Sequence, residues 1–170
     1  MHDPQAHACA VIEQTLSQLG IEADRPRPDA FVVSLPGEHK LATTCALVVG
    51  AHTVSVNAFV ARRPDEQHEE VYRLLLQRNV RLSGVAFALD RLGDIYLVGR
   101  LPLAAVDAQA IDQLLGAVVD AADSAFDRIL ATGFASSIRR EWHWRQSHGE
   151  SADNLEPFRA LLDLDADPDA

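Results

Sequence analysis

The sequence predicts an α+β fold, a two-layer sandwich in which helices cover one face of a five-stranded antiparallel sheet. Three observations predict it. Apolar residues recur at every second position in five segments, and at every third or fourth position in the segments around them. Within each run of strands only short breaks occur, which favours hairpins over the long crossovers of parallel strands. The strands alternate apolar with polar residues, so we expect one face of the sheet to be buried.

The first half of the chain is expected to form a helix followed by three strands. Over residues 4–20 apolar side chains follow the helical period, Pro4 suits a first turn, and Gly20 stands where helices commonly end. The link 22–29 is polar and holds two prolines, which indicates a loop. Period-two patterning then predicts strands over residues 31–37, 40–50 and 53–61.

A helix and two further strands follow. The helical period returns over residues 65–78, where Asp65 is expected to cap the first turn. Strands are then predicted over residues 83–90 and 94–101, and Pro102 closes the second one.

The longest helix is predicted over residues 107–133, with Asp107 as its N-cap and Gly133 at its C-terminal end. Gly116 lies inside this helix, where glycine costs roughly 1 kcal/mol against alanine, so we expect a close contact with the sheet there. A last helix is expected over residues 134–147. The predicted order is therefore α-β-β-β-α-β-β-α plus a C-terminal helix.

The length of 170 residues suits a single domain, which we place at residues 1–150. Residues 151–170 are predicted to be an acidic, flexible tail. Its end, 162-LDLDADPDA-170, carries four aspartates and no cation, a composition typical of solvated segments.

Composition and charge exclude some classes of binding partner. Fifteen Lys and Arg against 25 Asp and Glu give a net charge of −10, which opposes nucleic-acid binding because such binding depends on cations that neutralise phosphates. No apolar run approaches the roughly 20 residues of a membrane helix, and the first residues lack the pattern of a signal peptide. We therefore expect a cytoplasmic protein that binds neither membranes nor nucleic acid. Cys9 and Cys45 are expected to be small buried hydrophobes.

The segment 87-FALDRLGDIYLVGRLPL-103 contains two aspartates, Asp90 and Asp94, that raise the question of a catalytic or metal-binding pair. Between them Arg91-Leu92-Gly93 has the length of a hairpin loop, where glycine supplies a positive φ. A calcium loop would need more oxygen ligands than this segment offers. We interpret the pair as the frame of a turn.

The motifs of nucleophilic, nucleotide-binding and metalloprotease sites are not found in the sequence, so it predicts no catalytic, cofactor-binding or metal-ligating residues. A catalytic pair of carboxylates that are distant in the sequence and meet only in the folded chain stays an open alternative. An alternative to protein binding is a small-molecule site or an enzyme with a pocket beside the sheet. The arginines that this alternative would use to bind an anion are those at positions 62, 63, 78 and 100.

The segment 139-RREWHWR-145 carries the candidate partner-binding residues. In a helix Arg140 would lie over Trp144, Glu141 would pair with Arg145, and Trp142 would join the apolar stripe. Trp144 is then either half covered by arginine stems and the acidic tail, or an anchor for a partner, because Trp and Arg are common in binding hot spots. We take Arg140, Trp144 and Arg145 as the candidate set.

The segments 71-VYRLLLQRN-79, 85-VAFALDRLGDIYLVGRLPLAAVD-107 and 133-GFASSIRREWHWR-145 resemble the YbjN family of bacterial sensory transduction regulators, as found in actinobacteria. The resemblance covers nearly all of residues 4–147. It implies a fold similar to that of the type III secretion chaperones and a small acidic protein that binds other proteins as a dimer. The family has no accepted catalytic motif to transfer. The combined expectation is a non-enzymatic, cytoplasmic interaction module, a regulator or chaperone-like binder of a protein partner.

Overall fold

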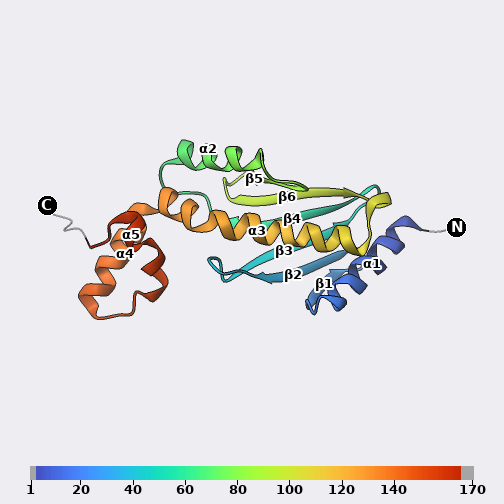
Figure 1. The fold of residues 1–170 in the computed structure, drawn as a ribbon, viewed down its shortest axis with the longest axis horizontal. Coiled ribbons are helices and arrows are strands. Elements are labelled where there is room, and N and C mark those ends of the chain that lie inside the picture. Colours follow the sequence, from blue (N-terminus) through green and yellow to red (C-terminus); the bar gives the residue numbers. More distant parts are fainter. Residues whose placement is uncertain (1–2, 166–170) are drawn as a thin grey trace.

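A computed structural model describes residues 3–165 of the chain, and residues 1–2 and 166–170 lie outside that description (Figure 1). The molecule has a layer of helices against one face of a sheet, as predicted. The helices are α1 (Pro4–Gln18), α2 (His68–Asn79), α3 (Ala108–Gly133), α4 (Ala135–His148) and α5 (Arg159–Leu162), with 3-10 turns η1 (Leu103–Ala105) and η2 (Asp153–Phe158). The strands are β1 (Ala23–Arg27), β2 (Ala30–Pro36), β3 (Ala42–Val49), β4 (Thr53–Ala61), β5 (Val85–Leu89) and β6 (Ile95–Pro102).

The sheet has six antiparallel strands in the order β1-β2-β3-β4-β6-β5, where the sequence predicts five. The additional strand is β1, which lies in the segment expected to be a loop. All five of its residues are exposed, so they show no apolar alternation. It pairs with β2 through the main chain, with an irregularity between Asp24 and Arg27. That break surrounds Pro26, and prolines are tolerated at edge strands and bulges.

Aspartate side chains cap the N-termini of the two helices α1 and α3. The Asp3 side chain accepts a hydrogen bond from the Gln5 main-chain N–H (3.0 Å) at the start of α1. The Asp107 side chain accepts one from the Ala110 main-chain N–H (2.7 Å) at the start of α3. Each bond satisfies a donor that has no partner inside the helix.

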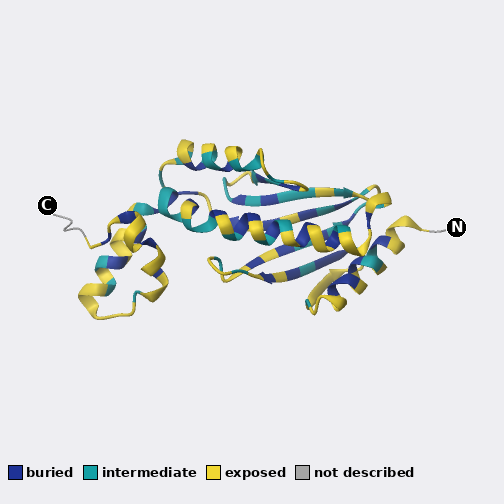
Figure 2. Cartoon of the chain, in the orientation of Figure 1, coloured by how far each residue is buried: buried dark blue, intermediate teal, exposed yellow. Residues whose placement is uncertain are grey.

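One apolar core lies between the sheet and the helices (Figure 2). From the sheet it takes every second residue, and from α1, α2 and α3 it takes the apolar stripes that the helical period predicts. Cys45 is fully buried in it, and burial raises the pKa of its thiol to about 12. Cys9 is only half-buried at the rim of the core. Among the largest fully buried side chains are Ile12, Phe31, Leu47, Ile95, Leu97, Ile111, Ile129 and Leu164.

The close contact expected at Gly116 is absent. The residue is exposed, and a Cβ atom added to it would meet nothing within 4 Å among the residues described. Gly133, at the end of the same helix, is the crowded one. A Cβ atom there would lie 2.9 Å from the Pro64 Cβ and 3.2 Å from the Val71 Cγ2. The prediction for Gly116 was wrong because periodicity shows which residues share a helix face but not how closely a neighbour approaches.

Residues 134–165 form a C-terminal hook that projects beyond the end of the sheet (Figure 1). The hook contains α4, η2 and α5. Where the sequence predicts a solvated tail, η2 and α5 pack their apolar side chains inward, and residues 166–170 of that tail lie outside the described residues. The buried side chains of the hook are Phe134, Ile138, Trp142, Leu155, Phe158, Leu162 and Leu164.

Candidate partner-binding surfaces

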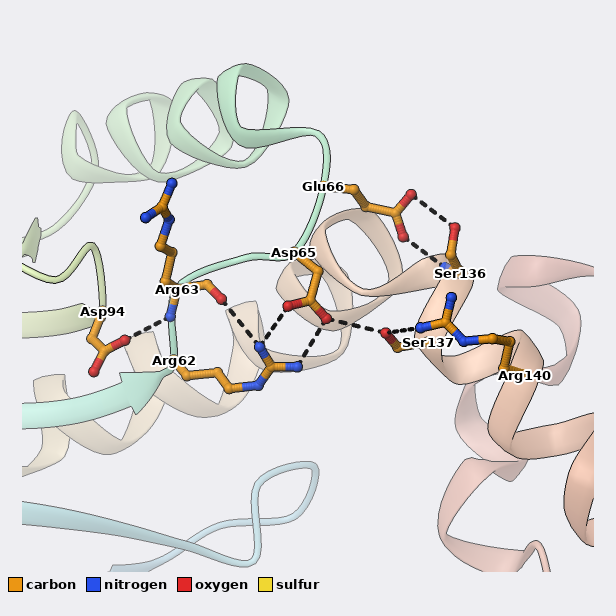
Figure 3. Close-up of polar contacts among 8 residues, drawn as sticks. All are labelled: Arg62, Arg63, Asp65, Glu66, Asp94, Ser136, Ser137 and Arg140. Carbon is orange, nitrogen blue, oxygen red and sulfur yellow. Dashed lines mark hydrogen bonds and ion pairs between the residues drawn. The ribbon is translucent and has the colours of Figure 1, made fainter.

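The loop of residues 62–67, between β4 and α2, holds the junction of α3 with the hook (Figure 3). The main-chain N–H groups of Asp65 and Glu66 both donate to the Gly133 carbonyl oxygen, at 2.9 and 3.1 Å. The Glu66 carboxylate accepts bonds from the Ser136 main-chain N–H (2.6 Å) and hydroxyl (3.0 Å). Phe134, which precedes α4, offers no side-chain cap, so Glu66 supplies the cap from another part of the chain.

Charged side chains extend this junction. The Arg62 guanidinium binds both carboxylate oxygens of Asp65, at 2.6 and 2.9 Å, and lies 4.4 Å from the centre of the Phe134 ring. Asp65 also accepts a bond from the Ser137 hydroxyl (3.1 Å), which in turn accepts one from Arg140 (3.1 Å). The hydrogen bonds from Arg62 lower the pKa of the Asp65 carboxyl. Asp65 therefore ties β4 to α4. The sequence predicted that Asp65 would cap α2, and that prediction was wrong, because α2 begins after Gln67, three residues later than expected.

The three candidate residues lie on α4, but they do not form one cluster. Arg140 is exposed and donates to the Ser137 hydroxyl. Arg145 is turned inward and binds the Glu141 carboxylate (2.7 Å), the Ser151 carbonyl oxygen (2.7 Å) and the Asn154 side chain (3.0 Å). The predicted pair of Glu141 with Arg145 is confirmed, and its further bonds show that Arg145 also closes the loop after α4.

Trp144 is the large aromatic side chain that the hook exposes, with 48% of its surface accessible. One face of its ring stacks on His148, with ring centres 4.5 Å apart, so the expected cover by Arg140 is replaced by a histidine one turn further on. Trp142 is 4% exposed and belongs to the core of the hook, as predicted. The hook thus presents an exposed tryptophan on a helix whose start is fixed by the junction.

A second surface is the outer face of the sheet, opposite α1 and α3 (Figure 1). Side chains that point to the helices are buried, and the residues between them remain half-buried or exposed. Phe59 and Tyr96 meet edge to face there, with ring centres 5.4 Å apart. We call this surface the outer sheet face and define it by Val32, Ala46, Val48, Phe59, Tyr96 and Val98, which the strand register places on one side.

Both edges of the sheet are obstructed. At the β5 edge, the Asn79 side chain accepts a bond from the Phe87 main-chain N–H (2.7 Å) and donates one to its carbonyl oxygen (3.2 Å). These are the groups that a further strand would use. At the other edge, β1 contains Pro26 and a break in its register. Such features protect edge strands from pairing with another chain.

The hairpin around Asp90 and Asp94 has the predicted geometry. Gly93 has a φ of +88°, and the Asp90 carboxylate accepts bonds from the main-chain N–H groups of Leu92 (2.8 Å) and Asp94 (2.9 Å). The Asp94 carboxylate accepts a bond from the Arg63 main-chain N–H (2.7 Å), a contact that the sequence does not reveal. The aspartates frame a turn, and Asp94 also attaches it to the junction loop.

The structure does not bring the four arginines of the alternative hypothesis together. Arg62 is paired in the junction, Arg78 binds Ser124 of α3, and Arg100 lies on the outer sheet face. Within residues 3–165, no group of three or more His, Cys, Asp or Glu side chains is arranged to hold a metal ion. No helix in that same range is long and apolar enough to cross a membrane.

Comparison with known proteins identifies relatives of the chain. The YbjN family model, described as "Putative bacterial sensory transduction regulator", matches residues 8–131, from α1 through most of α3. An uncharacterized protein of Mycobacterium leprae is 52% identical over 169 residues, covering 96% of this chain and 92% of the relative. An uncharacterized protein of Mycobacterium tuberculosis is 56% identical over 134 residues, or 79% of this chain and 73% of the relative.

Solved structures of low sequence identity share the fold. A chain of the ExsC–ExsE complex superposes with a TM-score of 0.56 at 16% identity, covering 74% of this chain and 96% of that one. A chain of the heterodimeric ExoU–SpcU complex from the type III secretion system of Pseudomonas aeruginosa gives 0.50 at 19% identity, with 72% and 98% covered. These matches confirm the predicted type III secretion chaperone-like fold.

Proposed function

Because the chain belongs to the YbjN family, we propose that it is a non-enzymatic, cytoplasmic module that acts by binding another protein. Two observations on similar proteins support the proposal. The family is described as one of regulators, and the chains that share the fold occur in protein complexes, ExsC–ExsE and ExoU–SpcU.

The observation that carries the proposal is the half-exposed Trp144 on a fixed helix. Tryptophan and arginine contribute most of the binding energy in many interfaces, especially when they are held in place before binding. The Glu66 cap fixes the start of α4, and Arg145 fixes the loop that follows it. We therefore assign Arg140, Trp144 and Arg145 to the partner-binding surface, with Trp144 as the anchor and Arg145 as its support.

Affinity capture from the cytoplasm of the source organism tests this assignment. We expect a protein that co-purifies with the native chain to be lost with Trp144→Ser and retained with Leu41→Ser. Leu41 is 90% exposed in the hairpin between β2 and β3, outside the hook, so its variant controls for the loss of an exposed apolar side chain. Equal recovery of the partner with both variants would contradict the proposal for Trp144.

We further propose that two copies of the chain associate through their outer sheet faces. Most soluble homo-oligomers are two-fold dimers, and the obstructed edges leave this face as the apolar surface that self-association would bury. Light scattering at micromolar concentration should give about twice the chain mass of 18.6 kDa. Val98→Lys should give the single mass, whereas Gln113→Lys, on the exposed side of α3, should not. A native chain that stays monomeric would contradict the dimer.

A further inference from the structure

A groove of about 620 Å³ lies between the end of α2, the turn that follows it, and α3. Its lining combines arginines with apolar side chains, and none of the described residues that line it is acidic. The main lining residues are Leu74, Arg78, Val80, Arg81, Leu82 and Arg128. We call it the arginine groove.

The charge of this groove is unusual for the chain, whose net charge is −10. Six of the other arginines in residues 3–165 pair with carboxylates, among them Arg62 with Asp65 and Arg73 with Glu69. Arg78, Arg81 and Arg128 form no ion pair with any residue from 3 to 165. Three unpaired guanidinium groups around one groove therefore form a local anion-binding surface on an acidic protein.

Contacts within the fold hold one of these cations in position and place the other two beside it. Arg78 donates to the Ser124 hydroxyl (3.0 Å) and to the Ser124 carbonyl oxygen (2.8 Å), which ties α2 to α3. Arg128 follows Ser124 by four residues and so lies on the same face of α3. The Arg81 main-chain N–H donates to the Arg78 carbonyl oxygen (2.9 Å). A guanidinium group that is not paired within the chain can bind a carboxylate of another molecule through two parallel hydrogen bonds.

The apolar part of the lining distinguishes between kinds of anion. Val80 is 85% exposed, and Leu74 and Leu82 are half-buried beside it. A small carboxylate or phosphate would use the arginines alone, whereas a peptide that alternates acidic with apolar residues would contact both. Nucleic acid is disfavoured because the rest of the chain repels phosphates.

We propose that the arginine groove binds an acidic segment of the protein partner, with an apolar side chain of that segment against Val80 and Leu82. The proposal rests on the protein-binding function and specifies which partner chemistry this surface recognises. It concerns a surface on α2 and α3, separate from Trp144 on the hook, so each can be tested without the other.

Selection of random dodecapeptides displayed on phage against the immobilised full-length chain tests the groove. We expect the selected peptides to combine aspartate or glutamate with apolar residues. Their affinity should fall roughly a hundredfold for Arg81→Gln/Arg128→Gln, since each lost charge-assisted contact is worth about tenfold. The control Arg27→Gln/Arg91→Gln has the same net charge and changes exposed arginines elsewhere, so we expect less than a twofold effect.

A second pair of variants tests the apolar contact. Val80→Ser should weaken the selected peptides about three- to tenfold, whereas Leu76→Ser, which is 66% exposed on α2 and does not line the groove, should leave them unchanged. The proposed role of the groove is refuted if no peptide is selected or if the selected peptides lack acidic residues. It is also refuted if the two double arginine variants bind the peptides equally well. Citrate that displaces the peptides at equal affinity, with no effect of Val80→Ser, would identify a small-anion site and also refute it. A partner still captured through Trp144 would show that the function stands without the groove.

Discussion

Alanine placed at two glycines of α3 should have opposite effects on stability. Gly116 is exposed and its added Cβ would touch nothing within 4 Å, so Gly116→Ala should stabilise the protein by about 1 kcal/mol through helix propensity alone. At Gly133 the same atom would press against the Pro64 Cβ at 2.9 Å and the Val71 Cγ2 at 3.2 Å. Neither neighbour can move easily, because both are buried. Overpacking of this kind costs about 1–3 kcal/mol.

A comparison of the two variants separates the effect of the close contact at Gly133 from the effect of helix propensity, since both variants make the same chemical change in one helix. The gain in helix propensity is common to both variants, so the difference between them is the overpacking cost of about 1–3 kcal/mol. At roughly 2–4 °C per kcal/mol for a chain of this size, the melting temperature of Gly133→Ala should lie about 2–12 °C below that of Gly116→Ala. Differential scanning calorimetry of both variants measures it. Equal stabilisation by the two alanines would refute the close approach of the junction loop to α3, and with it the fixed orientation of the hook.

Three other perturbations have defined outcomes. Gly93→Val should destabilise the protein by more than about 1 kcal/mol in thermal unfolding, because a β-branched residue is disfavoured at a φ of +88°; an unchanged melting temperature would count against the hairpin geometry. Asn79→Ala should cost about 1–3 kcal/mol in denaturant unfolding, because it leaves the Phe87 main-chain groups at the β5 edge without partners. In light scattering the variant should form species larger than those of the native chain, because the open edge can pair with another copy; wild-type behaviour in both assays would be inconsistent with an edge-blocking role. The hydrogen bond to Asp127 raises the pKa of His39 above its ordinary value of 6.5. A raised folded-state pKa stabilises the fold below the unfolded value and loses that effect as pH rises through the folded value. The native chain should therefore exceed His39→Gln in melting temperature at pH 5, and the gap should close by pH 9; a gap independent of pH would show that the ion pair does not contribute.

Most of the fold could be predicted because its elements carry strong apolar periods. The strands of the sheet centre alternate buried with exposed residues, and α3 keeps a continuous apolar stripe. The missed strand, β1, is exposed throughout and is held by main-chain pairing, which leaves no mark on side-chain pattern. In the C-terminal segment, Asp163 and Asp165 alternate with Leu162 and Leu164 and conceal the burial of both leucines.

The candidate surfaces were only partly predictable for a related reason. The segment of α4 could be found because tryptophan and arginine are rare enough to stand out, and helical spacing separated Trp142 from Trp144 correctly. Contacts between distant parts of the chain give no local signal. Glu66 and Ser136 lie 70 residues apart, and Arg78 and Ser124 lie 46 apart. The junction and the arginine groove both depend on such pairs, so they become visible only in the folded chain.

The quenching of tryptophan fluorescence by iodide tests the partner-binding role of the hook most directly. The chain has two tryptophans, of which Trp142 is 4% exposed and Trp144 is 48% exposed, so Trp144 should supply nearly all of the emission that iodide can quench. Addition of the captured partner should reduce that quenchable fraction in proportion to complex formation, as Trp144 becomes buried in the interface. A complex that forms with the quenchable fraction unchanged would contradict the proposed role of Trp144.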